Sequence, residues 1–398
     1  MQFSQVIGQS NLKRELPELM QENRLAHALL FLGKEGSGAL PLAIAFAGHI
    51  ITTSHPVTSA AGLFGESLFG EDPVSPQKQN TGSGGEDNKL ADMVHPDVHF
   101  SYPVVTKKAG TPPLSTDYIA DWREFVKSYP YGNVYDWLQF IGAENKQGNI
   151  TANECNDIIR KLNLKSFEGG YKVLIMWMPE YLGAEGNKLL KLIEEPPEKT
   201  VFILVAENEA QILPTILSRC QIIKVPALEA TDVRKALIER NNTDPINAVR
   251  IASVSEGNYR EALQMAQHAD EDWQNLLREW LNAIMRTGPA AQAKWVDEIV
   301  KLGREKQKQF LKYFTHLLQA AIRVGIMPTA GTQYAEKDLD FANRLNKITS
   351  VEQQQAIVEE LDNAAYYIER NANGKMLFMA LTIKIYHIIQ DKIVFLND

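Results

Sequence analysis

Two stretches of the chain, residues 11–51 and 151–225, alternate between apolar runs of strand length and segments with helical spacing. In the first stretch, Leu12, Leu16 and Leu19 form one stripe of a helix predicted over 11–22. The run "AHALLFLG" (26–33) predicts a buried strand, and "LPLAIAFAGHII" (40–51) predicts an apolar helix. This stretch therefore reads as helix, strand, glycine loop and helix.

The second stretch repeats the alternation. Thr151 and Glu154 have the spacing of a capping box at the start of a helix predicted over 151–166. Pro196 and Pro197 end a second amphipathic helix, predicted over 187–199. Apolar strands are predicted at 171–178, 200–208 and 221–225. Strands this apolar are typical of a parallel sheet covered by helices on both faces, so the predicted fold class is α/β.

Residues 52–150 lack this organisation and are predicted to be an insertion with one small helix near 117–128. Its segment "SPQKQNTGSGGEDN" (75–88) is polar and rich in glycine and serine, which predicts a mobile loop that a protease cuts first. After Pro226 the apolar strands stop. Short helices are predicted over 230–270, and longer amphipathic helices over 273–392.

Composition narrows the function classes. The chain has 398 residues, a net charge of −8 and two cysteines, Cys155 and Cys220. An acidic chain is a poor candidate for binding nucleic acid alone, because phosphate contacts need clustered lysine and arginine. Two distant cysteines indicate a reducing compartment. We find no signal peptide and no apolar stretch long enough to span a membrane, so we expect a cytoplasmic protein.

The sequence "GKEGSGAL" (33–40) begins as a phosphate-binding loop, which reads G-x-x-x-x-G-K-[ST]. Gly33, Gly36 and Gly38 stand at or near the glycine positions, but Ala39 and Leu40 replace the lysine and the hydroxyl residue. Neither side chain can neutralise phosphate or hold Mg²⁺. The preferred interpretation is a structural turn without a ligand, and weak nucleotide binding by backbone N–H groups is the alternative.

Four segments together resemble the bacterial clamp-loader branch of the AAA+ proteins: "RLAHALLFLGKEGSG", "GGYKVLIMWMPEYLGAEGNKLLKLIEEPP", "ILPTILSRCQIIKVP" and "SEGNYREAL". The pair "LLKLIEEPP" and "LSRC", split by a buried strand, is the specific signal. The resemblance implies a RecA-like domain with a parallel sheet over 1–226, including the insertion at 52–150. A small helical lid domain (227–272) and an all-α collar domain (273–398) are implied after it.

The resemblance also implies partners. The chain would join ATPase subunits of the gamma/tau type and a delta subunit in a ring of five. It would act on the sliding clamp indirectly and meet primer–template DNA through the assembled complex, with no membrane involved. Lys188 and Lys191 are candidate DNA contacts, although they could equally be solvated helix charges.

Active relatives end the "KVLIM" strand with Asp-Glu, to hold Mg²⁺ and polarise water, and place a polar phosphate sensor near the end of the next strand. This chain has Trp177 and Met178 at the first site, with Glu180 displaced beyond Pro179. It has Ala206 and Glu207 at the second, where a carboxylate would repel phosphate. We therefore expect no intrinsic ATPase activity and no bound cofactor, with ATP held by neighbouring subunits.

The resemblance makes Arg219, between Ser218 and Cys220, an arginine finger that acts on a neighbour's nucleotide. A surface ion pair is the alternative. Cys220 is interpreted as a packing residue. Arg260 falls where active relatives carry an arginine that senses their own nucleotide, and we interpret it as part of a structural ion pair.

Relatives often carry a small zinc module after the glycine-loop helix, built from four cysteines. Residues 52–94 contain no cysteine, and His49, His55, His95 and His99 fit no strong metal-binding pattern. We therefore expect no zinc.

Three hypotheses about function follow. The chain is a non-hydrolysing clamp-loader subunit, a motor ATPase with an unusual site, or an interaction protein outside replication that uses the same fold.

Overall fold

In the computed structural model, the described residues are 1–54, 90, 92–107, 110–143, 146–167, 170–267, 273–326, 336–369 and 372–391. They form two compact units. Residues Met1–Val233 and Gly257–Glu261 make the first unit, and Arg234–Glu256 with Ala262–Asp398 make the second. The predicted mobile loop at 75–88 lies outside the described residues. The predicted division into three domains stays a prediction.

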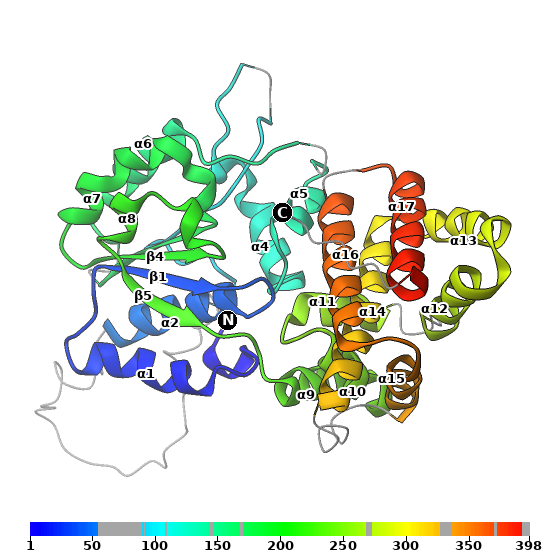
Figure 1. Cartoon of the computed structure of the whole chain (residues 1–398). Helices are drawn as coiled ribbons and strands as arrows, with labels where there is room; N and C mark the ends of the chain where they lie inside the picture. The colour runs from blue at the N-terminus through cyan, green and yellow to red at the C-terminus, as the bar shows by residue number, and fades with distance from the viewer. Residues whose placement is uncertain are drawn as a thin grey trace, which may run out of the picture. The chain divides into compact units, whose positions relative to one another are not determined.

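The first unit is built on a parallel sheet of five strands in the order β2-β3-β4-β1-β5 (Figure 1). The strands are β1 (Ala28–Gly33), β2 (Val98–Ser101), β3 (Lys172–Trp177), β4 (Thr200–Ala206) and β5 (Gln221–Val225). Strands β3 and β4 are buried along their whole length, because helices cover both faces of a parallel sheet. The predicted α/β fold is confirmed.

Alternate residues of each strand supply two separate cores, because successive side chains point to opposite faces. One core combines Leu29 and Phe31 with α1 (Ser10–Gln21), α2 (Ala39–Ser54), α4 (Ile119–Ser128) and α5 (Val134–Phe140). The other combines Ala28 and Leu30 with α6 (Ala152–Leu162), η3 (Pro179–Leu189), α7 (Leu190–Glu194) and α8 (Pro214–Leu217).

Two predictions in this part of the chain need correction. The helix predicted over 187–199 is mostly not α-helical: residues 179–189 form a 3₁₀ segment kinked at Gly183, and only Leu190–Glu194 are α-helical. The strand β5 is not buried on both faces. It lies at the edge of the sheet, and Ile222 is 42% exposed.

The prediction that residues 52–150 form a separate insertion was wrong for the part from 92 to 143. Strand β2 pairs with β3 as part of the sheet, and α4 and α5 pack into the core. Trp122 and Trp137 are fully buried with their rings 5.3 Å apart, and Trp122 also lies 5.1 Å from Trp177. This segment therefore completes one face of the sheet.

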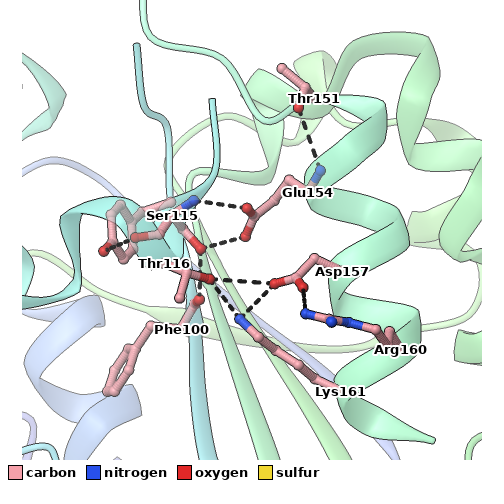
Figure 2. Close-up of polar contacts among 9 residues, drawn as sticks. Phe100, Ser115, Thr116, Thr151, Glu154, Asp157, Arg160 and Lys161 are labelled. Atoms are coloured by element: carbon pink, nitrogen blue, oxygen red, sulfur yellow. Dashed lines mark hydrogen bonds and ion pairs between the residues drawn. The ribbon is translucent and has the colours of Figure 1, made fainter. Parts of the chain in front are cut away.

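A polar network fixes the chain between β2 and α4 to helix α6 (Figure 2). The backbone N–H of Ser115 donates to Glu154 over 2.8 Å and its hydroxyl donates over 2.5 Å, while Glu154 is only 1% exposed. The Thr151 hydroxyl accepts from the Glu154 N–H at 3.4 Å, as the capping box predicts. The Glu154 side chain, however, serves Ser115 and leaves the box half-formed.

The second unit is helical. Its elements are α10 (Pro245–Val254), α12 (Trp273–Asn282), α13 (Pro289–Lys301), α14 (Arg304–Ile326), α15 (Glu336–Ile348), α16 (Val351–Glu369) and α17 (Gly374–Tyr386). Helices α9 (Ala230–Asn241) and α11 (Tyr259–Gln267) begin in the first unit.

Aromatic side chains form the centre of this helical unit. Trp280 stacks on Trp295 at 4.6 Å and donates from Nε1 to the Thr382 hydroxyl over 3.0 Å. Among the described helices, none combines the length and the apolar character needed to cross a membrane.

We predict that Trp137→Ala destabilises the first unit by about 3 to 5 kcal/mol, because it empties a core site and leaves a carbonyl unpaired. Trp137 donates from Nε1 to the Pro103 carbonyl over 2.7 Å. Urea denaturation followed by circular dichroism measures the loss. Tyr135→Ala, on the same helix but 45% exposed, is the control. Equal effects of the two substitutions would mean that the segment is not part of the core.

Candidate nucleotide site and arginine

The glycine loop joins β1 to α2 and has little room around its backbone. Gly36 has a φ of 70° and Gly38 a φ of 87°, values that favour glycine. A Cβ at Gly36 would lie 1.9 Å from Asn258 Oδ1, and one at Gly38 would lie 2.9 Å from the Tyr131 ring. The loop therefore keeps its glycines because protein atoms pack directly against it.

Tyr131 covers the loop from the segment between α4 and α5. It is 5% exposed, and its hydroxyl accepts from the Ile7 backbone N–H at 2.8 Å. Its ring also meets Tyr259 edge-on, with centroids 4.9 Å apart. Contacts from three distant parts of the sequence thus hold this side chain in place.

Apolar side chains fill the rest of the site. Ala39, Leu40, Trp177 and Met178 are each less than a tenth exposed and belong to one hydrophobic cluster. The cavity that remains beside the loop measures about 30 Å³. That is room for roughly two water molecules, whereas small-ligand pockets are about 300 Å³ or more.

Arg260 binds the glycine loop through Glu35 and binds helix α5 through Asp136. Its Nε and Nη2 donate to the two carboxylate oxygens of Asp136 over 2.5 and 2.7 Å, and its Nη1 donates to Glu35 over 3.2 Å. The residue is 7% exposed. Glu35 also accepts from Asn133 at 2.8 Å and from Asn258 at 3.2 Å. Arg260, interpreted from the sequence as part of a structural ion pair, therefore binds two carboxylates of its own chain.

The pKa values of Glu35 and Glu207 shift in opposite directions. Burial alone would raise the pKa of Glu35, but Arg260 and the two asparagines outweigh it and lower this pKa. Burial, the Glu35 carboxylate and Glu180 raise the pKa of Glu207 to about 8. A raised pKa makes ionisation of Glu207 less favourable, which weakens the repulsion of phosphate expected from this carboxylate.

Glu180 is directed at the chain after β4. Its Oε1 accepts from the backbone N–H groups of Glu207 and Asn208, over 2.7 and 2.9 Å. Burial raises its pKa. Glu180 thus supports the loop that carries Glu207, and it does not line the glycine-loop cavity.

Arg219 follows α8 and precedes the edge strand β5. Its Nε donates to Glu194 over 2.5 Å, and its Nη2 also pairs with that carboxylate. Its Nη1 donates to the Thr215 carbonyl over 2.7 Å and to the Ser218 hydroxyl over 3.2 Å. The side chain is 33% exposed. The helices that supply these partners, α7 and α8, lie side by side (Figure 1).

This contact gives a physical reason for the two sequence motifs to occur together. Glu194 belongs to "LIEEPP" and Arg219 to "LSRC", so each motif supplies one partner of the same ion pair.

The remaining candidate residues from the sequence are Cys220, Lys188 and Lys191. Burial raises the pKa of the Cys220 thiol to about 11, so it stays protonated and unreactive. Lys188 pairs with Glu185 at 3.8 Å, and Lys191 is exposed. Over the described part of the chain, no three His, Cys, Asp or Glu residues are grouped to hold a metal ion.

Sequence reasoning missed the partners of the loop. Tyr131, Asn133 and Asp136 lie in the supposed insertion, and Asp136 is 124 positions from Arg260. The signal that could have revealed this segment is the alternation of Val98, Phe100, Tyr102 and Val104, which is typical of a strand with one buried face.

The parallel sheet in this strand order, with a glycine loop between β1 and α2, is consistent with the RecA-like domain that the sequence resemblance implies. Residues 56–229 match the family described as "DNA polymerase III, delta subunit".

Three relatives illustrate the similarity. Subunit tau/gamma of Haemophilus influenzae is 24% identical over 67% of this chain and 30% of its own length. Subunit delta' of Yersinia pestis is 38% identical over 22% of this chain and 26% of its own length. Subunit delta' of Escherichia coli is 24% identical over 64% of this chain and 75% of its own length.

The chain thus contains a DNA polymerase III delta-type domain and is homologous to the tau, gamma and delta' clamp-loader subunits of that polymerase. It spans less than a third of the length of the first two relatives.

We predict that restoring the missing side chains with Ala39→Lys and Leu40→Thr does not restore ATP binding, because Tyr131 still fills the site. Adding Tyr131→Ala should permit binding by this double variant. Titration with a fluorescent ATP analogue measures the affinity, and circular dichroism checks that each variant is folded. Micromolar binding by the wild-type chain, or by the double variant with Tyr131 intact, would contradict the role of Tyr131.

We also predict a pH effect from Glu207. Its folded pKa is near 8, above the value of about 4.3 for an unperturbed glutamate. The folded state therefore holds an extra proton between these values, and stability falls as pH rises through this window. Glu207→Gln should flatten that fall and stabilise the chain at pH 8.5 by roughly 1 to 2 kcal/mol.

Thermal unfolding midpoints between pH 5.5 and 8.5 measure this effect. Glu209→Gln, an exposed acid two residues further on, serves as the control. If the Glu207 and Glu209 variants follow the wild-type pH profile equally, Glu207 is ionised in the folded protein.

Proposed function

We propose that this chain is a non-hydrolysing structural subunit of a DNA polymerase III clamp loader, in the role of delta'. It supports assembly of the ring and supplies Arg219 to the ATP site of a neighbouring subunit. The observation that carries this proposal is the contrast between two sites. The glycine-loop site is closed by Tyr131, Leu40 and Trp177, while the guanidinium of Arg219 reaches the surface beside the edge strand.

The chemistry of the arginine supports a role in trans. Guanidinium is always charged and offers two parallel donors to a developing phosphoryl charge. Arg260 is already committed to Asp136 and Glu35 in a buried site, whereas Arg219 keeps a third of its side chain exposed. Of these two arginines, Arg219 is therefore the better candidate for a phosphate outside the chain.

The principal alternative is a motor ATPase of the gamma/tau type, which the similarity to tau/gamma subunits favours. Leu40 at the magnesium position and Trp177 at the acid position argue against it. The third hypothesis, an interaction protein outside replication, gives Arg219 no role beyond its ion pair with Glu194.

The proposed partners are gamma/tau-type ATPase subunits and a delta subunit in a five-membered ring in the cytoplasm. ATP would be bound by those neighbours, and this chain would need neither a cofactor nor zinc. Through the assembled complex it would act on the sliding clamp and on primer–template DNA. Lys188 and Lys191 remain the candidate DNA contacts.

We predict that Arg219→Ala lowers DNA- and clamp-stimulated ATP turnover by the reconstituted loader and lowers clamp loading further. An arginine finger contributes about 10³-fold or more at the site it completes, but other sites in the ring keep turning over. Folding should hardly change, because an exposed ion pair contributes only about 0.2 to 1 kcal/mol.

Arg219→Lys should rescue poorly, because an ammonium group lacks the two-donor fork. The matched control is Arg160→Ala, which removes an exposed arginine that pairs with Asp157 on α6. If Arg219→Ala turns over ATP and loads clamps at the wild-type rate, the proposed role in trans is wrong.

A further inference from the structure

We propose that Glu194 is a positioning residue for the arginine finger: it holds Arg219 in the orientation in which the guanidinium meets a nucleoside triphosphate bound by the neighbouring subunit. This inference rests on the function proposed above. It goes further by assigning a role to Glu194, the first acid of the motif "LIEEPP".

The contacts of Arg219 involve all three nitrogens of its guanidinium but not all of its N–H groups. Glu194 takes Nε and one N–H of Nη2, and the Thr215 carbonyl takes one N–H of Nη1. A guanidinium has five N–H groups, so one N–H on each terminal nitrogen is left over. The 3.2 Å contact from Nη1 to Ser218 is the longest of the set, and a phosphate oxygen can replace it. Together, the two terminal nitrogens form the fork that phosphate binds.

The two helices that carry the partners of Arg219, α7 and α8, are short, but residues of both belong to the hydrophobic core. Leu192 and Ile193, which precede Glu194, belong to the core on one face of the sheet, and so does Ile216 of α8. Glu194 is the last residue of α7, directly before Glu195, Pro196 and Pro197. Buried residues before Glu194 and two prolines after it thus fix the backbone that carries its carboxylate. A carboxylate fixed in this way can orient the long, flexible side chain of Arg219.

The ion pair between Glu194 and Arg219 contributes more to the orientation of the arginine than to the stability of the fold. The side chain of Glu194 is 44% exposed and that of Arg219 is 33% exposed, so the pair adds little to the stability of the fold. A free arginine side chain samples many rotamers, and fixing it before the neighbour's phosphate arrives removes that entropic loss from the transition state. Glu194 should therefore act on kcat.

The test compares complete reconstituted loaders that differ only in this chain. The chain is either wild type or carries one of five changes: Glu194→Ala, Glu194→Gln, Glu195→Ala, Arg219→Ala, or Glu194→Ala combined with Arg219→Ala. ATP turnover is measured over a range of ATP concentrations for each complex, after size-exclusion chromatography shows equal assembly. Glu195→Ala removes the same charge one residue further on, and the contacts of Arg219 go to Glu194, Thr215 and Ser218.

Glu194→Ala is expected to lower kcat by part of the fall that Arg219→Ala causes, and by no more than that fall, and to leave KM within about twofold, because orientation is lost in the transition state. Glu194→Gln should keep most of the activity, since its amide oxygen still accepts from Arg219. Glu195→Ala should behave as wild type, and the double variant should be no slower than Arg219→Ala.

The results separate a failure of the proposed function from a failure of this inference. Arg219→Ala at the wild-type rate overturns the proposed function and this inference with it. If Arg219→Ala is slow while Glu194→Ala is normal or faster than wild type, the proposed function stands and Glu194 is no positioning residue. A double variant much slower than Arg219→Ala would mean that Glu194 acts independently of the arginine, which also overturns the inference.

Discussion

The buried guanidinium of Arg260 is the interaction on which the glycine-loop region depends. A charge that is 7% exposed must be paired, and Asp136 and Glu35 supply that pairing through three hydrogen bonds. Arg260 thereby ties together the loop after β1, the start of α5 and the segment Gly257–Glu261. Asn258, in the same segment, occupies the space beside Gly36. The loop is therefore held by carboxylates of the protein where a related ATPase would need the phosphates of ATP.

The same region explains why the loop keeps its glycines without its lysine. Tyr131 and Asn258 approach Gly38 and Gly36 so closely that a side chain at either position would collide with them. Trp177, at the position where the resemblance implies an acid, instead joins Trp122 and Phe125 in the aromatic cluster that anchors α4. Core residues thus occupy the positions where the resemblance implies catalytic residues. The loop is closed by side chains of the protein itself, while Arg219, near the edge strand, keeps a third of its side chain exposed.

The sequence predicted the sheet and the glycine turn well, because both depend on local patterns: apolar runs of strand length and glycines followed by an apolar helix. It did not predict β2, α4 and α5 as part of the core. Pro103, Pro112 and Pro113 interrupt the apolar pattern there, and the partners of Trp137 and Tyr131 are distant in the sequence. The motif predicted Arg219 as a candidate, whereas its contact with Glu194 appears only when α7 and α8 come together, 25 positions apart. Burial also raises the pKa of Glu207, a shift that a sequence cannot report.

The central claim is that this chain has no usable nucleotide site of its own and contributes Arg219 to a neighbour's site. The most direct measurement is photo-crosslinking with an ATP analogue that carries the reactive group on its γ-phosphate, followed by peptide mapping of this chain. We expect no labelling of the isolated chain. In the assembled loader we expect labelling of the peptide around residues 214–225. Labelling of the peptide that contains residues 33–41, in the isolated chain or in the complex, would contradict it.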